Sequence, residues 1–216
     1  MPIYVKSGSY TLGQKFAAGG GSYTQASVDS LKLWTRFRSS PVDESGNGLV
    51  VSYTGSPVVD GQQIPDSEKS RIPDLPVAKF DGASSNAAIA ATPLLAFADG
   101  STDLPFTVAG WANIDDTGGA EPLFNMPEPG NAYKAYGLVV DAQNAYSFSL
   151  NTNAGIIPPD RIIVESEWYV VPRGKWFHFA VSYDGSKSDA GVTLYVNGAR
   201  VGKRSAATVD YTGLNV

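Results

Sequence analysis

The chain of 216 residues contains no cysteine and a single histidine. Without cysteine it can form no disulfide, hold no metal through thiolates and use no cysteine nucleophile, and one histidine cannot build a zinc site of several histidines. These absences exclude most metalloenzyme and hydrolase chemistries from this chain alone. A cysteine-free protein suits the cytosol, and it equally suits a particle that is assembled there and exposed outside later.

Basic residues are also scarce, with 16 Lys and Arg against 21 Asp and Glu and a formal net charge of −5. This is the wrong sign for neutralising phosphates, so we expect neither nucleic acid nor an anionic membrane as partner. No segment approaches the ~20 apolar residues of a membrane span. The first residues, MPIYVKSGSYTLG, have no basic stretch followed by an apolar run, so no secretory signal is expected.

Helical periodicity is almost missing, whereas turn residues abound, with 23 glycines and 14 prolines. From Leu31 onward short apolar runs alternate with turns about every ten residues, which predicts strands. Alternating faces and hairpin turns are clearest in PFTVAGWANI (105–114), YGLVV (136–140), YSFSL (146–150), KWFHFAVSYDG (175–185) and GVTLYVNGARV (191–201). Strands without intervening helices predict an all-β fold, a two-sheet antiparallel jelly-roll sandwich.

Within this sandwich we expect the core to include Phe177, Phe179, Val181, Val192, Leu194 and Val196. Residues 58–77 contain three prolines and several charges and are predicted to be loop. The one helical-looking stretch, NAAIAATPLLAF (86–97), is interrupted by Pro93 and should form one or two helical turns at most.

The first thirty residues differ from the rest. Ile3-Tyr4-Val5 alternates like a strand, and AAGGGSYTQAS follows it, so residues 1–30 are predicted to form an extended N-terminal arm with a Gly-rich hinge. The alternative is a disordered terminus. Residues 31–216 then form the sandwich domain.

Several segments occur in the order found in one known family. They are LKLWTRFR (31–38) with DESGNGLVVSYTGSP (43–57), KFDG (79–82), LPFTVAGWANID (104–115) and GKWFHFAVSYDGSKSDAGVTLYVNGARV (174–201). Together they resemble the laminin-G-like jelly-roll domains of the concanavalin A-like lectin and glucanase superfamily. The resemblance spans roughly residues 31–201 and implies a concanavalin A-like jelly roll. Since that superfamily includes lectins, adhesion modules, glycosidases and spacers, it does not by itself imply a function.

The family's last hairpin is followed by two further strands, and the remaining GKRSAATVDYTGLNV (202–216) is too short for both. If LKLWTRF (31–37) takes the family's opening position, its neighbour is missing and a sheet edge stays open. We expect Ile3-Tyr4-Val5, or a strand of a neighbouring protein, to fill that gap. The protein would then be a homo-oligomer or an assembly subunit.

A catalytic site is not expected. The glucanase relatives carry a Glu-x-Asp-x-Glu cluster on one strand, which this chain lacks. The nearest feature is Glu165-Ser166-Glu167, predicted to be the wet side of a half-buried strand. His178 falls where the family motif has a histidine and is predicted to be a packed structural residue.

No cofactor is expected, with calcium as the open alternative. Asp43-Glu44-Ser45-Gly46-Asn47-Gly48 begins like a calcium loop, but Thr54 stands at position twelve instead of glutamate, so a plain glycine turn is favoured. Asp115 and Asp116, with Glu121 nearby, form a second oxygen-rich loop. The metal ligands, if any, stay unknown.

Glycan binding needs exposed aromatic faces beside hydrogen-bonding groups, because a sugar presents C–H faces and a rim of hydroxyls. Two loops have this composition, PEPGNAYKAY (127–136) with Tyr133 and Tyr136, and ESEWYVVPR (165–173) with Trp168 and Tyr169. These four residues are the predicted ligand-binding residues. The alternative is that they pack the loops onto the sheets.

These features predict a non-enzymatic surface protein of a bacterial virus, a decoration, fibre or adhesion module at the virion surface with weak glycan binding. Its expected partners are other virion or appendage proteins and cell-surface glycans. The alternatives are a secreted bacterial lectin or carbohydrate-binding module, which would be extracellular, and a degenerate glycosidase.

Overall fold

The computed structural model describes residues 2–7, 31–37, 40–60, 77–90, 92–98, 102–115, 119–128, 131–152 and 160–214. In these ranges the chain forms strands, turns and two short 3-10 helices, η1 (Pro93–Leu95) and η2 (Asp189–Gly191). None of the helices in the described ranges has the length and apolar character needed to cross a bilayer.

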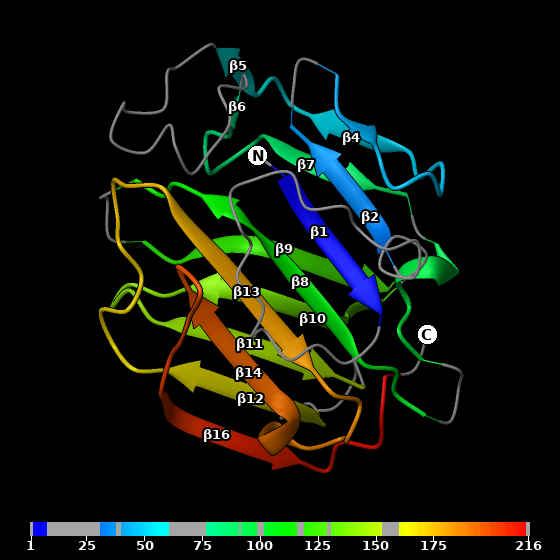
Figure 1. The fold of residues 1–216 in the computed structure, drawn as a ribbon, viewed down its shortest axis with the longest axis vertical. Coiled ribbons are helices and arrows are strands. Elements are labelled where there is room, and N and C mark those ends of the chain that lie inside the picture. Colours follow the sequence, from blue (N-terminus) through cyan, green and yellow to red (C-terminus); the bar gives the residue numbers. More distant parts are fainter. Residues whose placement is uncertain are drawn as a thin grey trace, which may run out of the picture.

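Two antiparallel sheets lie face to face (Figure 1). The seven-stranded sheet has the order β15 (Ala199–Arg200), β14 (Val192–Val196), β13 (Phe177–Tyr183), β8 (Phe106–Ala112), β1 (Pro2–Ser7), β2 (Leu31–Arg36) and β3 (Val42–Asp43). The five-stranded sheet has the order β16 (Lys203–Val209), β12 (Arg161–Ser166), β11 (Tyr146–Asn151), β10 (Asn131–Val140) and β9 (Glu121–Glu128). The predicted two-sheet sandwich is confirmed.

Two small sheets lie beside the sandwich, at the top of Figure 1. One pairs β4 (Val51–Thr54) with β7 (Asn86–Ile89), and the other pairs β5 (Val58–Asp60) with β6 (Val77–Lys79). The helical reading of 86–97 is therefore wrong for 86–89, which alternate in burial as a strand does, and a helical turn forms only at η1. The loop predicted for 58–77 begins and ends in paired strand, and residues 61–76 lie outside the described ranges.

The core lies between the two large sheets because alternate side chains of each strand point inward. All six predicted core residues are buried, with Phe177, Phe179 and Val181 at 0% exposure. Phe106 of β8 is the centre of an aromatic cluster, stacked on Phe97 at 4.7 Å between ring centroids. Phe179 of β13 stacks on Phe124 of β9 at 6.3 Å and thus joins the two sheets.

The N-terminal strand lies inside the seven-stranded sheet. Ile3 pairs with Thr35 of β2 on one side and with Gly110 of β8 on the other. The gap expected beside 31–37 is thus filled by Ile3-Tyr4-Val5 of the same chain, in the interior of the sheet and not at its edge. Residues 2–7 therefore belong to the sheet, while the hinge predicted after them lies in 8–30, outside the described ranges.

Two strands of the five-stranded sheet were not expected from the sequence. β9 contains Pro122 and Pro127, and it is the edge strand, where a missing N–H breaks no ladder. β16 is the opposite edge and pairs with β12. The short C-terminal segment thus supplies one strand.

A buried carboxylate closes the fold after β16. Asp103, 3% exposed, accepts hydrogen bonds from the hydroxyls of Tyr183 and Tyr211, both at 2.8 Å, and from the backbone N–H of Leu214 at 2.7 Å. Burial and the neighbouring Asp103 carboxylate raise the pKa of both tyrosines, so both hydroxyls keep their protons and donate. These four residues form the Asp103 node, which connects Asp103 with β13 and with the last described residues of the chain.

Candidate functional site

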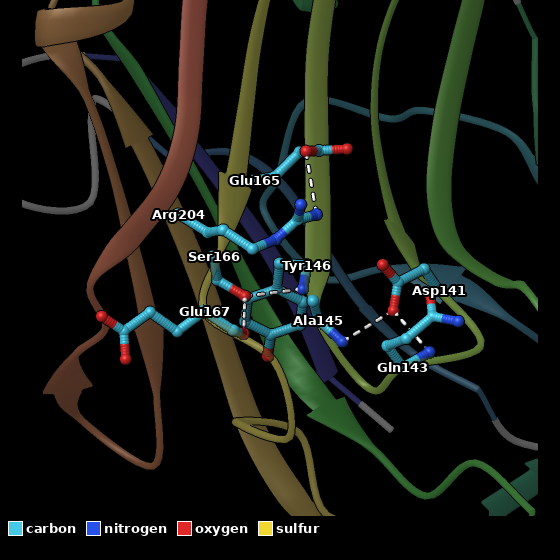
Figure 2. Close-up of polar contacts among 8 residues, drawn as sticks. All are labelled: Asp141, Gln143, Ala145, Tyr146, Glu165, Ser166, Glu167 and Arg204. Atoms are coloured by element: carbon cyan, nitrogen blue, oxygen red, sulfur yellow. Dashed lines mark hydrogen bonds and ion pairs between the residues drawn. The ribbon is translucent and has the colours of Figure 1, made fainter.

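The candidate site is the turn that follows β12, residues 167–171. Ser166, the last residue of the strand, is fully buried, and its hydroxyl accepts from the Tyr146 N–H at 2.8 Å and donates to the Glu167 carbonyl at 2.9 Å (Figure 2). A serine at this point ends the strand because its side chain bonds backbone groups that a ladder would otherwise pair. The chain then turns outward at Trp168 and Tyr169.

Trp168 and Tyr169 are exposed at the tip of this turn. Trp168 is 54% and Tyr169 76% exposed, so both aromatic side chains leave most of their apolar surface in water. Tyr169 also has a φ of +60°, a left-handed conformation that is uncommon and costly for a bulky residue. Packing in the core accounts for neither the exposure of these side chains nor the backbone conformation of Tyr169.

Backbone hydrogen bonds fix the turn against the β10–β11 hairpin. The N–H groups of Tyr169 and Val171 donate to the carbonyls of Gln143 and Asn144, both at 3.0 Å. The hairpin itself is held by Asp141, whose carboxylate accepts the N–H of Gln143 at 2.8 Å and of Ala145 at 2.9 Å (Figure 2). Hydrogen bonds to the hairpin therefore hold the backbone of the turn that carries the two exposed aromatic residues.

Arg173 connects the hairpin to a neighbouring loop. Its guanidinium donates to the carbonyls of Asp115 at 3.2 Å, Gly119 at 2.6 Å and Asp141 at 3.0 Å, and its Nε to the Asn144 side chain. A planar, permanently charged fork suits this task of joining several carbonyls. Three loops distant in sequence are thereby held together under the turn.

Arg204 lies beside Trp168 because of a β-bulge. The register between β12 and β16 shifts after Glu165, so Glu165 pairs with Ser205, Ser166 pairs with Lys203, and Arg204 is the extra residue. A bulge re-aims the side chain of the extra residue. The Arg204 guanidinium carbon lies 4.9 Å from the Trp168 ring centroid. Its Nη2 lies 2.9 Å from Glu165 Oε2, an ion pair that Figure 2 shows.

The side chains of Glu165 and Glu167 point in different directions (Figure 2). Glu165 is half-buried on the strand and bonded to Arg204, whereas the side chain of Glu167 points away from that ion pair (Figure 2). Glu167 instead packs over Gly202, where an added Cβ would lie 3.0 Å from its Oε1. Retaining glycoside hydrolysis needs two carboxyl groups converging at ~5 to 5.5 Å on one bond.

The second predicted glycan loop is not supported in the same way. Tyr136 is 4% exposed, packs against Phe97 and Phe106, and donates from its hydroxyl to the Leu95 carbonyl at 2.9 Å. The prediction that Tyr136 binds a ligand is wrong, because it points inward from β10. Tyr133 lies on the same strand, but its side chain is outside the described part of the structure, so its assignment stays a prediction.

His178 lies on the outer face of the seven-stranded sheet, where its ring meets the edge of Trp111 with centroids 5.4 Å apart. Burial lowers the pKa of this histidine below its ordinary value of 6.5. Its environment is that of a packed residue, as expected from the sequence.

The first calcium candidate is a turn stabilised by its own side chains. The carboxylate of Asp43 accepts the N–H groups of Ser45 at 2.9 Å and Leu49 at 3.0 Å, and Asn47 donates to the Leu31 carbonyl at 2.8 Å. Asp115 is exposed, and Asp116 lies outside the described ranges. Among the residues that the structure does describe, no three His, Asp or Glu side chains gather around one point.

Sequence reasoning missed Arg204, Arg173 and Gln143 at this site. Arg204 is brought to Trp168 by a register shift, which no local pattern announces. Arg173 carries no local signal either, because its acceptors lie at residues 115, 119, 141 and 144, distant in sequence. The Glu165 carboxylate was noticed, but its partner was not.

Comparison with known protein families identifies the superfamily of this chain. The profile of the concanavalin A-like lectin/glucanases superfamily, in its laminin-G-like form, matches residues 81–215, more than half of the sequence. No curated protein matches.

Two of the solved structures that resemble the fold are binding domains. One is the binding domain of botulinum neurotoxin DC in complex with rat synaptotagmin II, the other the same domain in complex with SialylT. Each is 13% identical, with a TM-score of 0.53, and the alignment covers 87% of this chain but 42% of the toxin chain. At this identity the likeness shows the fold alone. By the match over residues 81–215, the chain belongs to the concanavalin A-like lectin/glucanase superfamily.

Proposed function

We propose that this protein is a carbohydrate-binding, lectin-like module that binds without turning its ligand over, and that the turn carrying Trp168 and Tyr169 is its binding site. The observation that carries the proposal is the exposure of these two aromatic side chains, 54% and 76%, on a turn held by hydrogen bonds on both sides. Sugars bind to such surfaces through their C–H faces. A rigid support reduces the entropy lost on binding.

Binding proteins of the same fold support this proposal by analogy only. The toxin domains that resemble it are binding domains by description, one with a protein receptor and one with SialylT. The chain spans less than half of those proteins, so their partners are not transferred to it.

The test is a glycan array probed with the wild-type chain, Trp168→Ala, Tyr169→Ala and Tyr195→Ala. Tyr195 alternates with the buried Leu194 and Val196 and so lies on the outer face of the other sheet. Each change in the turn should weaken binding about tenfold or more, and Tyr195→Ala should leave it unchanged at matched thermal stability. Binding that survives both turn substitutions would move the site elsewhere.

The absence of turnover is part of the proposal. Glu165 is engaged by Arg204, and Glu167 is turned away from it, so no carboxyl pair is set up for acid and base roles. Incubation of the bound glycans with the protein should release no reducing ends. Release that disappears in Glu165→Gln would make the protein a glycosidase instead.

We also propose that the module acts at the surface of a larger assembly, with a bacterial virus particle as the context expected from the sequence. Support comes from the chemistry of the chain, which has no cysteine and an acidic balance. Purified particles of a phage that encodes this protein should carry it in stoichiometric amounts. Native mass measurement should find an oligomer or a stable complex with another particle protein, whereas a lone monomer absent from particles would favour a secreted lectin.

A further inference from the structure

We infer that the Trp168 turn selects neutral sugars with two adjacent hydroxyls and rejects carboxylated ones, because Arg204 and Glu165 form a nearly neutral donor and acceptor pair beside it. This inference rests on the proposed function and specifies the ligand of the same site. It begins from what each side chain of the pair has left to offer a ligand.

Arg204 has donors left for a ligand. One nitrogen, Nη2, bonds Glu165, and the guanidinium carbon lies 4.9 Å from the Trp168 ring centroid. Stacking on the ring fixes the plane of the guanidinium without using its N–H groups. In the described part of the chain the other N–H groups of Arg204 have no partner, and its side chain remains 33% exposed.

Glu165 is complementary to this. Its Oε2 bonds Arg204, while Oε1 has no partner among the described residues, and the side chain is 28% exposed. The pair therefore presents N–H donors and a carboxylate acceptor side by side. A sugar hydroxyl both donates and accepts, so one hydroxyl of an adjacent pair can donate to Glu165 while the next accepts from Arg204.

Trp168 and Tyr169 have different roles in the inferred site. The guanidinium covers one side of the Trp168 ring, so the ring holds the arginine in place as well as offering its exposed part. Tyr169, 76% exposed, is free to receive the C–H face of a sugar. The ligand is thus held by one apolar face and by two adjacent hydroxyls.

A carboxylated sugar meets an obstacle at the same place. To bond Arg204 it has to bring its negative charge next to the Glu165 carboxylate or displace that carboxylate from the guanidinium. Either change costs electrostatic energy that a neutral sugar does not pay, and specificity arises from that difference. Glu165 therefore acts as the specificity-determining residue.

The experiment compares wild type with Glu165→Gln, Arg204→Gln and Asp210→Asn. The probes are mannose-, galactose- and glucose-terminated oligosaccharides as neutral sugars, and hexuronate- and sialate-terminated ones as carboxylated sugars. Asp210→Asn is the matched control, since it removes an exposed carboxylate that lies outside the turn, after the last residue of β16. Dissociation constants and melting temperatures are measured for each variant.

Wild type should bind a neutral probe about tenfold or more tightly than any carboxylated probe. Glu165→Gln should lower neutral affinity several-fold and raise carboxylate affinity, reducing or reversing the preference, while Arg204→Gln should weaken both classes. Asp210→Asn should leave both the affinities and the preference in place.

Two outcomes overturn the inference in distinguishable ways. If the wild type prefers carboxylated probes, and Trp168→Ala still abolishes that binding, the proposed site stands and the selectivity inferred here is wrong. If no probe of either class binds, or binding ignores Trp168 and Tyr169, the proposed function itself fails and the inference fails with it.

Discussion

At the residue scale, the positions that bear on function combine exposure with restraint. Tyr169 is the most exposed of the large apolar side chains in the described ranges, yet its backbone holds a left-handed φ of +60° and donates to Gln143. A solvent-exposed residue in a strained backbone conformation is a better indicator of a functional site than a buried one, because packing does not account for it. Tyr136 differs from Tyr169 in this respect. Loop composition predicted both as ligand-binding residues, but Tyr136 is buried.

His178 makes the stability of the fold depend on pH. It is the only histidine in the chain, and burial lowers its pKa below 6.5. The unfolded chain therefore binds a proton that the folded chain resists, and the free energy of unfolding should fall as the pH drops from about 7.5 toward 5.5. Urea unfolding at several pH values measures this.

The His178→Gln variant is the control for this pH dependence. It should show a flatter profile over the same range, because the remaining acidic groups titrate mostly below it. Parallel slopes for the two proteins would mean that His178 is as easily protonated in the folded state as in the unfolded one.

Substitutions at two glycines measure the cost of backbone strain separately from the cost of a steric contact. Gly185 and Gly198 have nearly equal φ values of +82° and +79°, but a Cβ on Gly185 would lie 2.7 Å from the Asp103 carbonyl oxygen, whereas one on Gly198 would meet nothing within 4 Å. Gly198→Ala should cost about 1–2 kcal/mol for the left-handed conformation. Gly185→Ala should cost about 1–3 kcal/mol more. Denaturant unfolding measures both, and equal costs would contradict the contact.

At the element scale, β1 joins two strands that are far apart in the sequence. Its residues pair with β2 on one side and β8 on the other, so its removal would leave two rows of backbone donors and acceptors open. No other strand in the described ranges is placed to take over both ladders.

Deletion of residues 1–7 should lower the Tm by at least about 5 °C and promote self-association. A synthetic peptide spanning residues 1–10 should restore the Tm in trans, whereas a scrambled peptide should not. Calorimetry and light scattering check the two effects. A stable monomer of unchanged Tm would show that β1 contributes little to the sheet.

Elements with a strong period of two were predictable from the sequence. β8, β11, β12 and β14 alternate between buried and half-buried positions as expected, and Asn197-Gly198 forms its turn at positive φ. The strands that escaped prediction lack that signal for physical reasons. β9 has two prolines that only an edge tolerates, and β7 has small residues that fit a helix or a strand equally well.

The candidate site was half predictable. Trp168 and Tyr169 could be named because large aromatic residues beside a polar turn stand out in a sequence. Arg204 could not, since its place next to Trp168 depends on one extra residue in β16 and on pairing with a strand some forty residues earlier. Such long-range register is set by the whole sheet and not by the residues around it.

At the scale of the whole molecule, the two large sheets are joined by aromatic contacts through a shared core. Phe179 is fully buried and stacks on Phe124 of the opposite sheet at 6.3 Å between centroids. Close-packed interiors relax only partly, so removal of this ring would leave a cavity.

Phe179→Ala should lower the free energy of unfolding by about 3–5 kcal/mol through lost burial and the cavity left behind. Tyr169→Ala, which removes an exposed aromatic side chain, should change it by about 0.5 kcal/mol or less. Guanidinium denaturation of both variants measures the difference. Similar losses in the two would mean that the sheets are held together elsewhere.

The Asp103 node also bears on how the protein is made. Its carboxylate finds its partners at Tyr183, Tyr211 and Leu214, a span of 111 residues to the last of these. A nascent chain on the ribosome carries Asp103 long before residue 214 emerges, so the carboxylate has to stay hydrated during most of synthesis. The Asp103 node can be completed only when translation has passed residue 214, and contacts of such long sequence separation form slowly.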